Sequence, residues 1–273
     1  MSKKENSSKT LSQFLETIVS EGRHYFTVEE LIKGLQVQEG SLSVSLSRLS
    51  QKGRVKMIRR GFGIIMASHG GEPHPTAYVD AMLKHLDSKY YVGLLSAAAH
   101  WGAAHQAAMS YQIVVNKIIK KISYERSRIE FITKKGILPE KWIQRVAGPE
   151  GYYNISSPEL TAIDLIRFPR RAGHLNNVAT VLEDLVEKWD GRKMASLCYE
   201  TWVPTVTLQR LGYLLDGVLD LRRESNYILP GLEKRAPIPS LLSTNKKNDK
   251  VAVKDFEYNN KWSLYLNTQV EPD

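Results

Sequence analysis

A short polar run near the beginning of the chain carries side chains that can hydrogen-bond to DNA. Ser41, Ser43 and Ser47 are small, and a long base, Arg48, follows them. Small side chains let a helix backbone approach the base edges of the major groove, where serine and arginine both bond to bases. Serines on a helix can also simply face solvent, so the neighbouring segments must decide between the two interpretations. The predicted DNA-contacting residues are Ser41, Ser43, Val44, Ser47, Arg48, Gln51, Lys52, Arg54, Lys56, Arg59 and Arg60.

Positive charge is concentrated directly after this run. Positions 51 to 63 hold Lys52, Arg54, Lys56, Arg59 and Arg60 and no acidic residue. A second basic stretch, which we predict to form a secondary basic surface, contains Lys117, Lys120, Lys121, Arg126 and Arg128, followed by Lys134 and Lys135. Glu125 and Glu130 offset it in part. The formal net charge is +9 and the isoelectric point is about 9.4, which favours polyanionic partners such as nucleic acid.

The elements that would position these side chains can be read from periodicity. Apolar residues recur at helical spacing over 10–20 and again after Thr27, which forms a capping box with Glu30. A third helix is expected over 41–51, with Leu42, Leu46 and Leu49 on its inner face. Two short strands, 54–60 and 63–67, meet around glycines that supply positive φ angles. Three helices and a basic hairpin in this order predict a winged helix-turn-helix, with the wing along the phosphates or in the minor groove.

The rest of the chain predicts a larger domain. A Gly- and Pro-rich break precedes a helical stripe at 78–86 and a small-residue helix at 92–108. Strands are expected at 111–116 and 128–133, and helices return after Ser157, over 175–189 and after Pro204. We predict a winged helix-turn-helix at 1–69, a linker at 70–76, a C-terminal domain at 77–242 and a polar, mobile tail at 243–273. The fold class is α+β, mainly α, with an N-terminal winged helix-turn-helix followed by a larger α/β domain.

Motifs for catalysis and metal binding are missing from the sequence. A single cysteine, Cys198, excludes a zinc knuckle and an intramolecular disulfide, and it fits the cytoplasm. His100 and His105 are five apart, roughly 140° around a helix, and do not form an i, i+4 metal pair. His69 and His74 have no carboxylate cluster nearby, and the acidic group Glu183, Asp184, Glu187 and Asp190 reads as a solvated helix face. We therefore expect no catalytic residue, no metal, no cofactor and no membrane span.

Four segments resemble the AbiEi-type antitoxins of abortive-infection, type IV toxin–antitoxin systems. The most characteristic is 157–169, and 90–98, 177–182 and 209–216 occur in the same order; the likeness runs from Leu11 to about Leu219. The resemblance implies a bacterial repressor that binds double-stranded DNA at inverted repeats in its own promoter. It also implies a C-terminal antitoxin domain that neutralises a nucleotidyltransferase-like toxin. Many such pairs act without a stable complex, so direct contact is not implied.

Other functions stay open on the sequence alone. A stand-alone winged-helix transcription factor with a ligand-sensing body would need a pocket in that body. An enzyme acting on nucleic acid would need a cluster of carboxylates or histidines in a cleft. A single winged helix makes limited contact with DNA, so we expect two copies on each operator.

Overall fold

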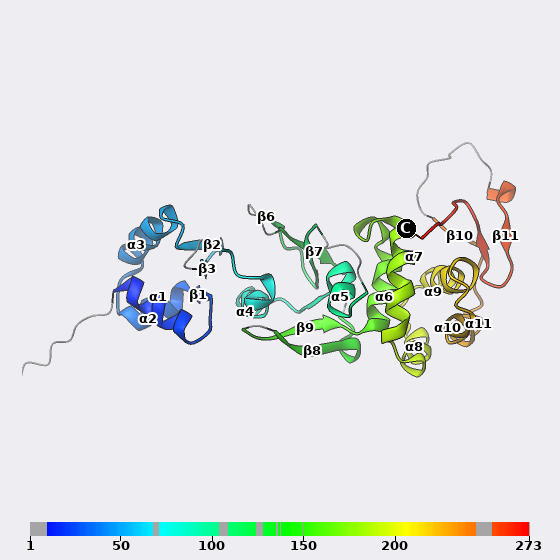
Figure 1. The fold of residues 1–273 in the computed structure, drawn as a ribbon, viewed down its shortest axis with the longest axis horizontal. Coiled ribbons are helices and arrows are strands. Elements are labelled where there is room, and N and C mark those ends of the chain that lie inside the picture. Colours follow the sequence, from blue (N-terminus) through cyan, green and yellow to red (C-terminus); the bar gives the residue numbers. More distant parts are fainter. Residues whose placement is uncertain are drawn as a thin grey trace, which may run out of the picture. The chain divides into compact units, whose positions relative to one another are not determined.

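The computed structural model describes residues 10–67, 71–103, 109–123, 128–134, 136, 138–148, 150–243 and 253–272 (Figure 1). The chain divides into two compact units. Unit 1 consists of Met1–Tyr90, Val115–Leu138 and Arg145–Asn154, and unit 2 consists of Tyr91–Val114, Pro139–Gln144 and Ile155–Asp273. The fold is α+β and mainly α, as predicted. Among the described helices, none combines the length and the apolar character that crossing a bilayer requires. The domain boundaries that we drew from the sequence stay predictions.

The N-terminal part of unit 1 has the topology of a winged helix. Its elements are α1 (Leu11–Ser20), β1 (Tyr25–Thr27), α2 (Val28–Leu35), α3 (Glu39–Gln51), β2 (Val55–Arg59) and β3 (Phe62–Ile65). The strands form an antiparallel sheet in the order β1-β3-β2. We refer to residues 10–67 as the head. Its core contains Leu15, Ile18, Phe26, Leu31, Leu42, Leu46, Val55 and Ile65, so the predicted inner face of α3 is buried.

Side-chain hydrogen bonds cap the N-termini of the first two helices. Thr27 Oγ1 accepts the Glu30 N–H at 3.2 Å, and Glu30 Oε2 accepts the Thr27 N–H at 3.5 Å. This capping box confirms the predicted start of α2. Thr10 forms an equivalent box with Gln13 before α1. Both helices therefore start where a threonine side chain satisfies backbone donors that the helix leaves unpaired.

The wing shows why its glycines are needed. Gly61 has φ 76°, as expected for the tight turn. Gly63 has no positive φ, which corrects our reading of it as a turn residue. A Cβ at this position would lie 2.4 Å from Phe26 Cζ. Gly63 is therefore required because β1, a strand that the sequence pattern did not reveal, brings Phe26 onto β3.

A six-stranded sheet has the order β6-β7-β5-β4-β9-β8 and contributes residues to both units. Its strands are β4 (Tyr90–Val92), β5 (Tyr111–Val115), β6 (Ile122–Ser123), β7 (Arg128–Thr133), β8 (Ile143–Gly148) and β9 (Gly151–Ser156). The expected strands at 111–116 and 128–133 are confirmed. The helix expected from 92 begins later, at α5 (Leu94–His100), because Val92 pairs with Ile155 of β9 in a parallel ladder. Residues 104–108 of that expected helix, His105 included, lie outside the described residues.

Unit 2 is rich in helices. Besides α5, it contains α6 (Pro158–Arg167), α7 (His174–Leu185), α8 (Gly191–Cys198), α9 (Thr205–Tyr213), α10 (Arg222–Asn226) and α11 (Leu229–Glu233). The Ser157 hydroxyl accepts the Leu160 N–H at 3.3 Å, which confirms the predicted cap. Inside the unit, the buried Tyr91 hydroxyl donates to the buried Asp164 carboxylate. Burial raises the pKa of Tyr91 well above its usual value, and the Asp164 charge adds to the effect.

Short helical segments complete the described elements. Unit 1 also contains α4 (Val79–His85), which follows a 3₁₀ turn. The 3₁₀ turns are Pro75–Ala77, Glu140–Trp142, Pro169–Arg171, Val186–Lys188 and Val253–Asp255, and Leu214–Val218 extends α9 as a π-helical turn.

The end of the chain is folded against unit 2 where the structure describes it. Strands β10 (Ser240–Leu241), β11 (Tyr258–Asn259) and β12 (Leu264–Tyr265) form a sheet in the order β10-β12-β11. Trp262 is completely buried, and its Nε1 donates to Asp216 Oδ2 at 3.0 Å. The expectation of a mobile tail is therefore wrong for residues 253–272, because the buried Trp262 side chain attaches this polar segment to the core of unit 2. Residues 244–252 lie outside the described part.

Candidate nucleic-acid interface

The outer face of α3 is exposed along its whole length. Ser41, Ser43, Ser47, Arg48 and Gln51 are all exposed, whereas Leu42 and Leu46 face the head's core. Val44 lies among the exposed residues and is 53% exposed. A helix with small polar side chains on its open face can approach base edges closely. The candidate interface therefore begins on α3, where the sequence predicted it.

Some of the basic side chains that follow α3 lie beside carboxylates. Lys52 is exposed, but the Lys56 ammonium lies 3.3 Å from Glu72 Oε1, with both side chains largely covered. The Arg54 guanidinium lies 3.9 Å from Glu16 Oε1. Positions 51 to 63 contain no acidic residue, but the fold places carboxylates from α1 and from the segment after β3 beside two of their basic side chains. The positive charge of this part is consequently lower than the sequence alone indicates.

The two wing arginines have different surroundings. Arg60 is exposed, and its backbone carbonyl accepts a hydrogen bond from His85 Nε2 at 2.9 Å. The Arg59 guanidinium donates to the Ile58 carbonyl at 2.9 Å and to the Lys120 carbonyl, and its Cζ lies 5.6 Å from the Phe131 ring centre. Carbonyl bonds and an aromatic face are typical of a structural arginine. Arg59 therefore holds the wing against the segment between β5 and β6.

That segment carries the secondary basic surface. Lys120, Lys121 and Arg128 are exposed. Lys117 is also exposed, but its ammonium donates to the Asp87 carbonyl at 2.6 Å and to the Leu86 carbonyl, at the end of α4. Arg126 lies outside the described residues. Because Arg59 bonds to Lys120, the wing and the exposed lysines of this stretch are neighbours within unit 1. No sequence pattern indicates this connection, since the two residues are 61 positions apart.

We predict that Arg59 and Arg60 respond differently to conservative replacement. Arg60→Ala should weaken binding to the protein's promoter by about 1 kcal/mol, with the salt slope falling by about one, and Arg60→Lys should restore most of the loss. Arg59→Lys should bind as weakly as Arg59→Ala, because lysine cannot bond two carbonyls in a fork. Mobility-shift titrations at several salt concentrations measure both effects. Arg59→Lys binding like the parent, with Arg59→Ala weak, would instead mean that the Arg59 charge contacts the DNA.

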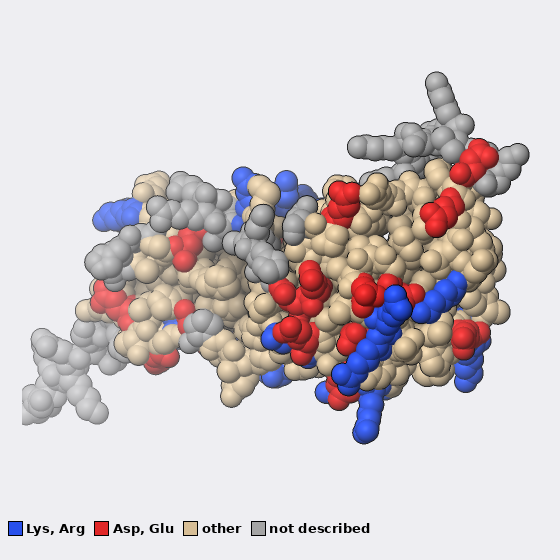
Figure 2. Space-filling view, turned by 45° about the vertical axis from the view of Figure 1, so that its right-hand side comes forward, with Lys and Arg blue, Asp and Glu red and all other residues tan. Residues whose placement is uncertain are grey.

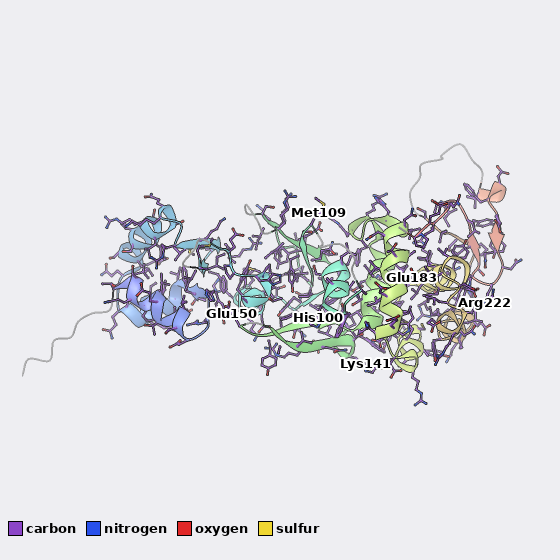
Figure 3. All side chains as sticks on the ribbon, in the orientation of Figure 1. His100, Met109, Lys141, Glu150, Glu183 and Arg222 are labelled. Carbon is purple, nitrogen blue, oxygen red and sulfur yellow. The ribbon has the colours of Figure 1, made fainter. Side chains whose placement is uncertain are left out.

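Titratable side chains elsewhere in the described chain bear on the question of a metal site. No cluster of three or more histidine, cysteine or carboxylate side chains suited to a metal occurs among the residues described. His100 on α5 and Glu183 on α7 are labelled in Figure 3. Burial lowers the pKa of His100 and raises that of the Cys198 thiol to about 12. Asp190, from the predicted acidic face, caps α8 by accepting the Arg192 and Lys193 N–H groups at 2.8 Å and 3.2 Å.

Two cavities bear on the possibility of a small ligand. One in unit 2 has a volume of about 80 Å³ and is lined in part by Arg170, His174 and Arg210. It is well below the roughly 300–1,000 Å³ of drug-sized sites. The other, a groove of about 490 Å³, lies in the head beside α1, the end of α3 and β3. Figure 2 shows one face of the molecule, on which acidic and basic side chains are interspersed.

Comparison with known proteins agrees with the fold and with the resemblance found in the sequence. Residues 91–217 match the family model described as the AbiEi antitoxin C-terminal domain. A crystal structure of the RV2827C protein from Mycobacterium tuberculosis is similar, with a TM-score of 0.68 and 15% sequence identity over 93% of this chain and 89% of that one. Curated protein sequences gave no match to this chain. The structural likeness concerns the fold, and the family match concerns residues 91–217.

Proposed function

We propose that the protein is the antitoxin of a bacterial toxin–antitoxin pair and that it represses its own operon, because residues 91–217 match the AbiEi antitoxin C-terminal domain model. The antitoxin role rests on the domain itself. The domain match is also the reason to propose a protein that acts by binding and not as an enzyme. Its counterpart is a toxin, which we propose to be nucleotidyltransferase-like.

The repressor role rests on the head. Its single strongest support is the outer face of α3, where small polar residues and Arg48 are exposed beside a hairpin that carries the exposed Arg60. In winged helices the corresponding helix enters the major groove and the wing contacts the backbone. Lys120 and Lys121 are exposed, and the Arg59 bond to the Lys120 carbonyl makes them neighbours of the wing, which supports a basic surface that continues beyond the wing. We propose that two copies bind inverted repeats in the promoter.

The decisive experiment measures binding of the full-length protein to the DNA upstream of its own gene. We expect a specific complex that an excess of unrelated DNA does not displace, with affinity falling steeply as salt rises. Binding no tighter than to unrelated DNA of the same length would end the repressor proposal. The neighbouring gene, expressed alone and then with this protein, tests the antitoxin part: growth arrest followed by rescue is expected.

A stand-alone transcription factor with a ligand-sensing body is the second candidate. The cavity of about 80 Å³ in unit 2 gives it little support, because it accommodates at most a small ion or a few water molecules. A harmless neighbouring gene, together with promoter binding that a metabolite extract changes, would favour this candidate over the antitoxin.

A further inference from the structure

Val44 is an exposed apolar residue at the centre of the outer face of α3. It follows the buried Leu42 by two positions, which is roughly 200° around a helix, so it points directly away from the core. Its side chain is 53% exposed. The residues around it on this face are glycine, serine, arginine and glutamine: Gly40, Ser41, Ser47, Arg48 and Gln51.

The fold of the head gives no reason for a valine at this position. The core is filled from the opposite face of α3 by Leu42 and Leu46. A β-branched side chain lowers helix propensity slightly, and exposing it removes the benefit of burial. The serines beside Val44 are short, so its two methyl groups are the most prominent apolar atoms that this face presents to a partner.

The major groove offers one apolar group, the 5-methyl of thymine. The other base-edge groups in this groove are hydrogen-bond donors and acceptors, which serine, glutamine and arginine can satisfy and valine cannot. We propose that Val44 contacts a thymine methyl and so makes the protein select thymine at one position of each half-site. The inference rests on the proposed function, since it requires α3 to lie in the major groove.

The test uses the promoter fragment in two forms, amplified with thymidine or with deoxyuridine triphosphate. Uracil differs from thymine only by the missing methyl group, and the operator sequence need not be known. One methyl contact is worth roughly a fourfold change in affinity. We expect the full-length protein to bind the uracil fragment roughly four times more weakly for each copy bound. Val44→Ala should bind the thymine fragment with a similar loss and should no longer distinguish the two fragments.

Ser50→Ala is the matched control, because Ser50 is also exposed on α3, carries no methyl group and is not one of the predicted DNA-contacting residues. It should keep the parent's preference for thymine. Alanine favours the helix at both positions, and thermal unfolding of each variant checks that the head remains folded. Specific binding that is equal on the two fragments would overturn the inference and leave the repressor function intact. The same follows if Val44→Ala keeps the parent's thymine preference. Absence of specific binding to either fragment would remove the proposed function and the inference together.

Discussion

Trp262→Ala should destabilise the protein by about 3–5 kcal/mol, the largest loss of stability that we expect from one substitution. The indole is completely buried, its Nε1–H bonds to Asp216 Oδ2, and its ring lies against Gly212. Alanine leaves a large cavity and a carboxylate without that donor. Urea unfolding followed by far-ultraviolet circular dichroism measures the change. We also expect the rescue of growth to fall, because Trp262 packs on Gly212, which lies within the residues 91–217 that match the AbiEi antitoxin C-terminal domain model.

Lys261→Ala is the control for this prediction. Lys261 is next to the tryptophan and its ammonium lies 2.9 Å from the same Asp216 oxygen, but its side chain is 40% exposed. Ion pairs with this exposure contribute about 0–1 kcal/mol. A Trp262→Ala protein as stable as Lys261→Ala would mean that residues 253–272 do not contribute to the core of unit 2.

The second large effect is expected from reversing the charge of Arg48 and Arg60, two exposed arginines of the candidate interface. The double variant Arg48→Glu, Arg60→Glu should bind the promoter at least about 100-fold more weakly. Each arginine contact with DNA is worth on the order of 1 kcal/mol, and a carboxylate adds repulsion from the phosphates. The same variant should still rescue growth, because both substitutions lie outside residues 91–217, which match the AbiEi antitoxin C-terminal domain model. Mobility shifts and a co-expression growth assay measure the two properties separately.

The matched control reverses two other exposed arginines, Arg192 on α8 and Arg223 on α10. It changes the net charge by the same amount and should retain promoter binding, with only the modest loss that a lower overall charge produces. Equal loss in both double variants would show that net charge, and not the head's surface, determines binding. Loss of rescue in the first variant would show that neutralisation also depends on the head.

The sequence predicted the head well because its elements are defined locally. The α2 capping box is contained within four residues, and the inner face of α3 repeats within one helix. The hairpin is contained in adjacent segments. Strands β1, β4, β8 and β9 escaped prediction, since short strands are stabilised by partners distant in the sequence. The residues of Tyr90–Val92 were instead assigned to helix or left unassigned.

For the candidate interface, the sequence could predict which residues take part but not which partners they contact. The sequence identified the bases, but not that Glu16 and Glu72 lie beside Arg54 and Lys56. Nor did it indicate that Arg59 supports the Lys120 backbone. Such pairings depend on tertiary contacts between residues far apart in the chain, which no local pattern encodes. A polar composition also concealed Trp262, since one buried aromatic side chain hardly changes the average character of a segment.

The contact between Gly212 and Trp262 limits how related sequences can diverge. A Cβ at position 212 would lie 1.9 Å from Trp262 Cζ3, so no larger residue fits while the indole is present. Positions 212 and 262 should therefore covary during evolution: a homologue that acquires a side chain at the first must shrink or lose the aromatic ring at the second. The order of the two changes is constrained as well. If the aromatic ring shrinks first, the intermediate protein contains a cavity. If the glycine is enlarged first, the intermediate protein contains a steric clash.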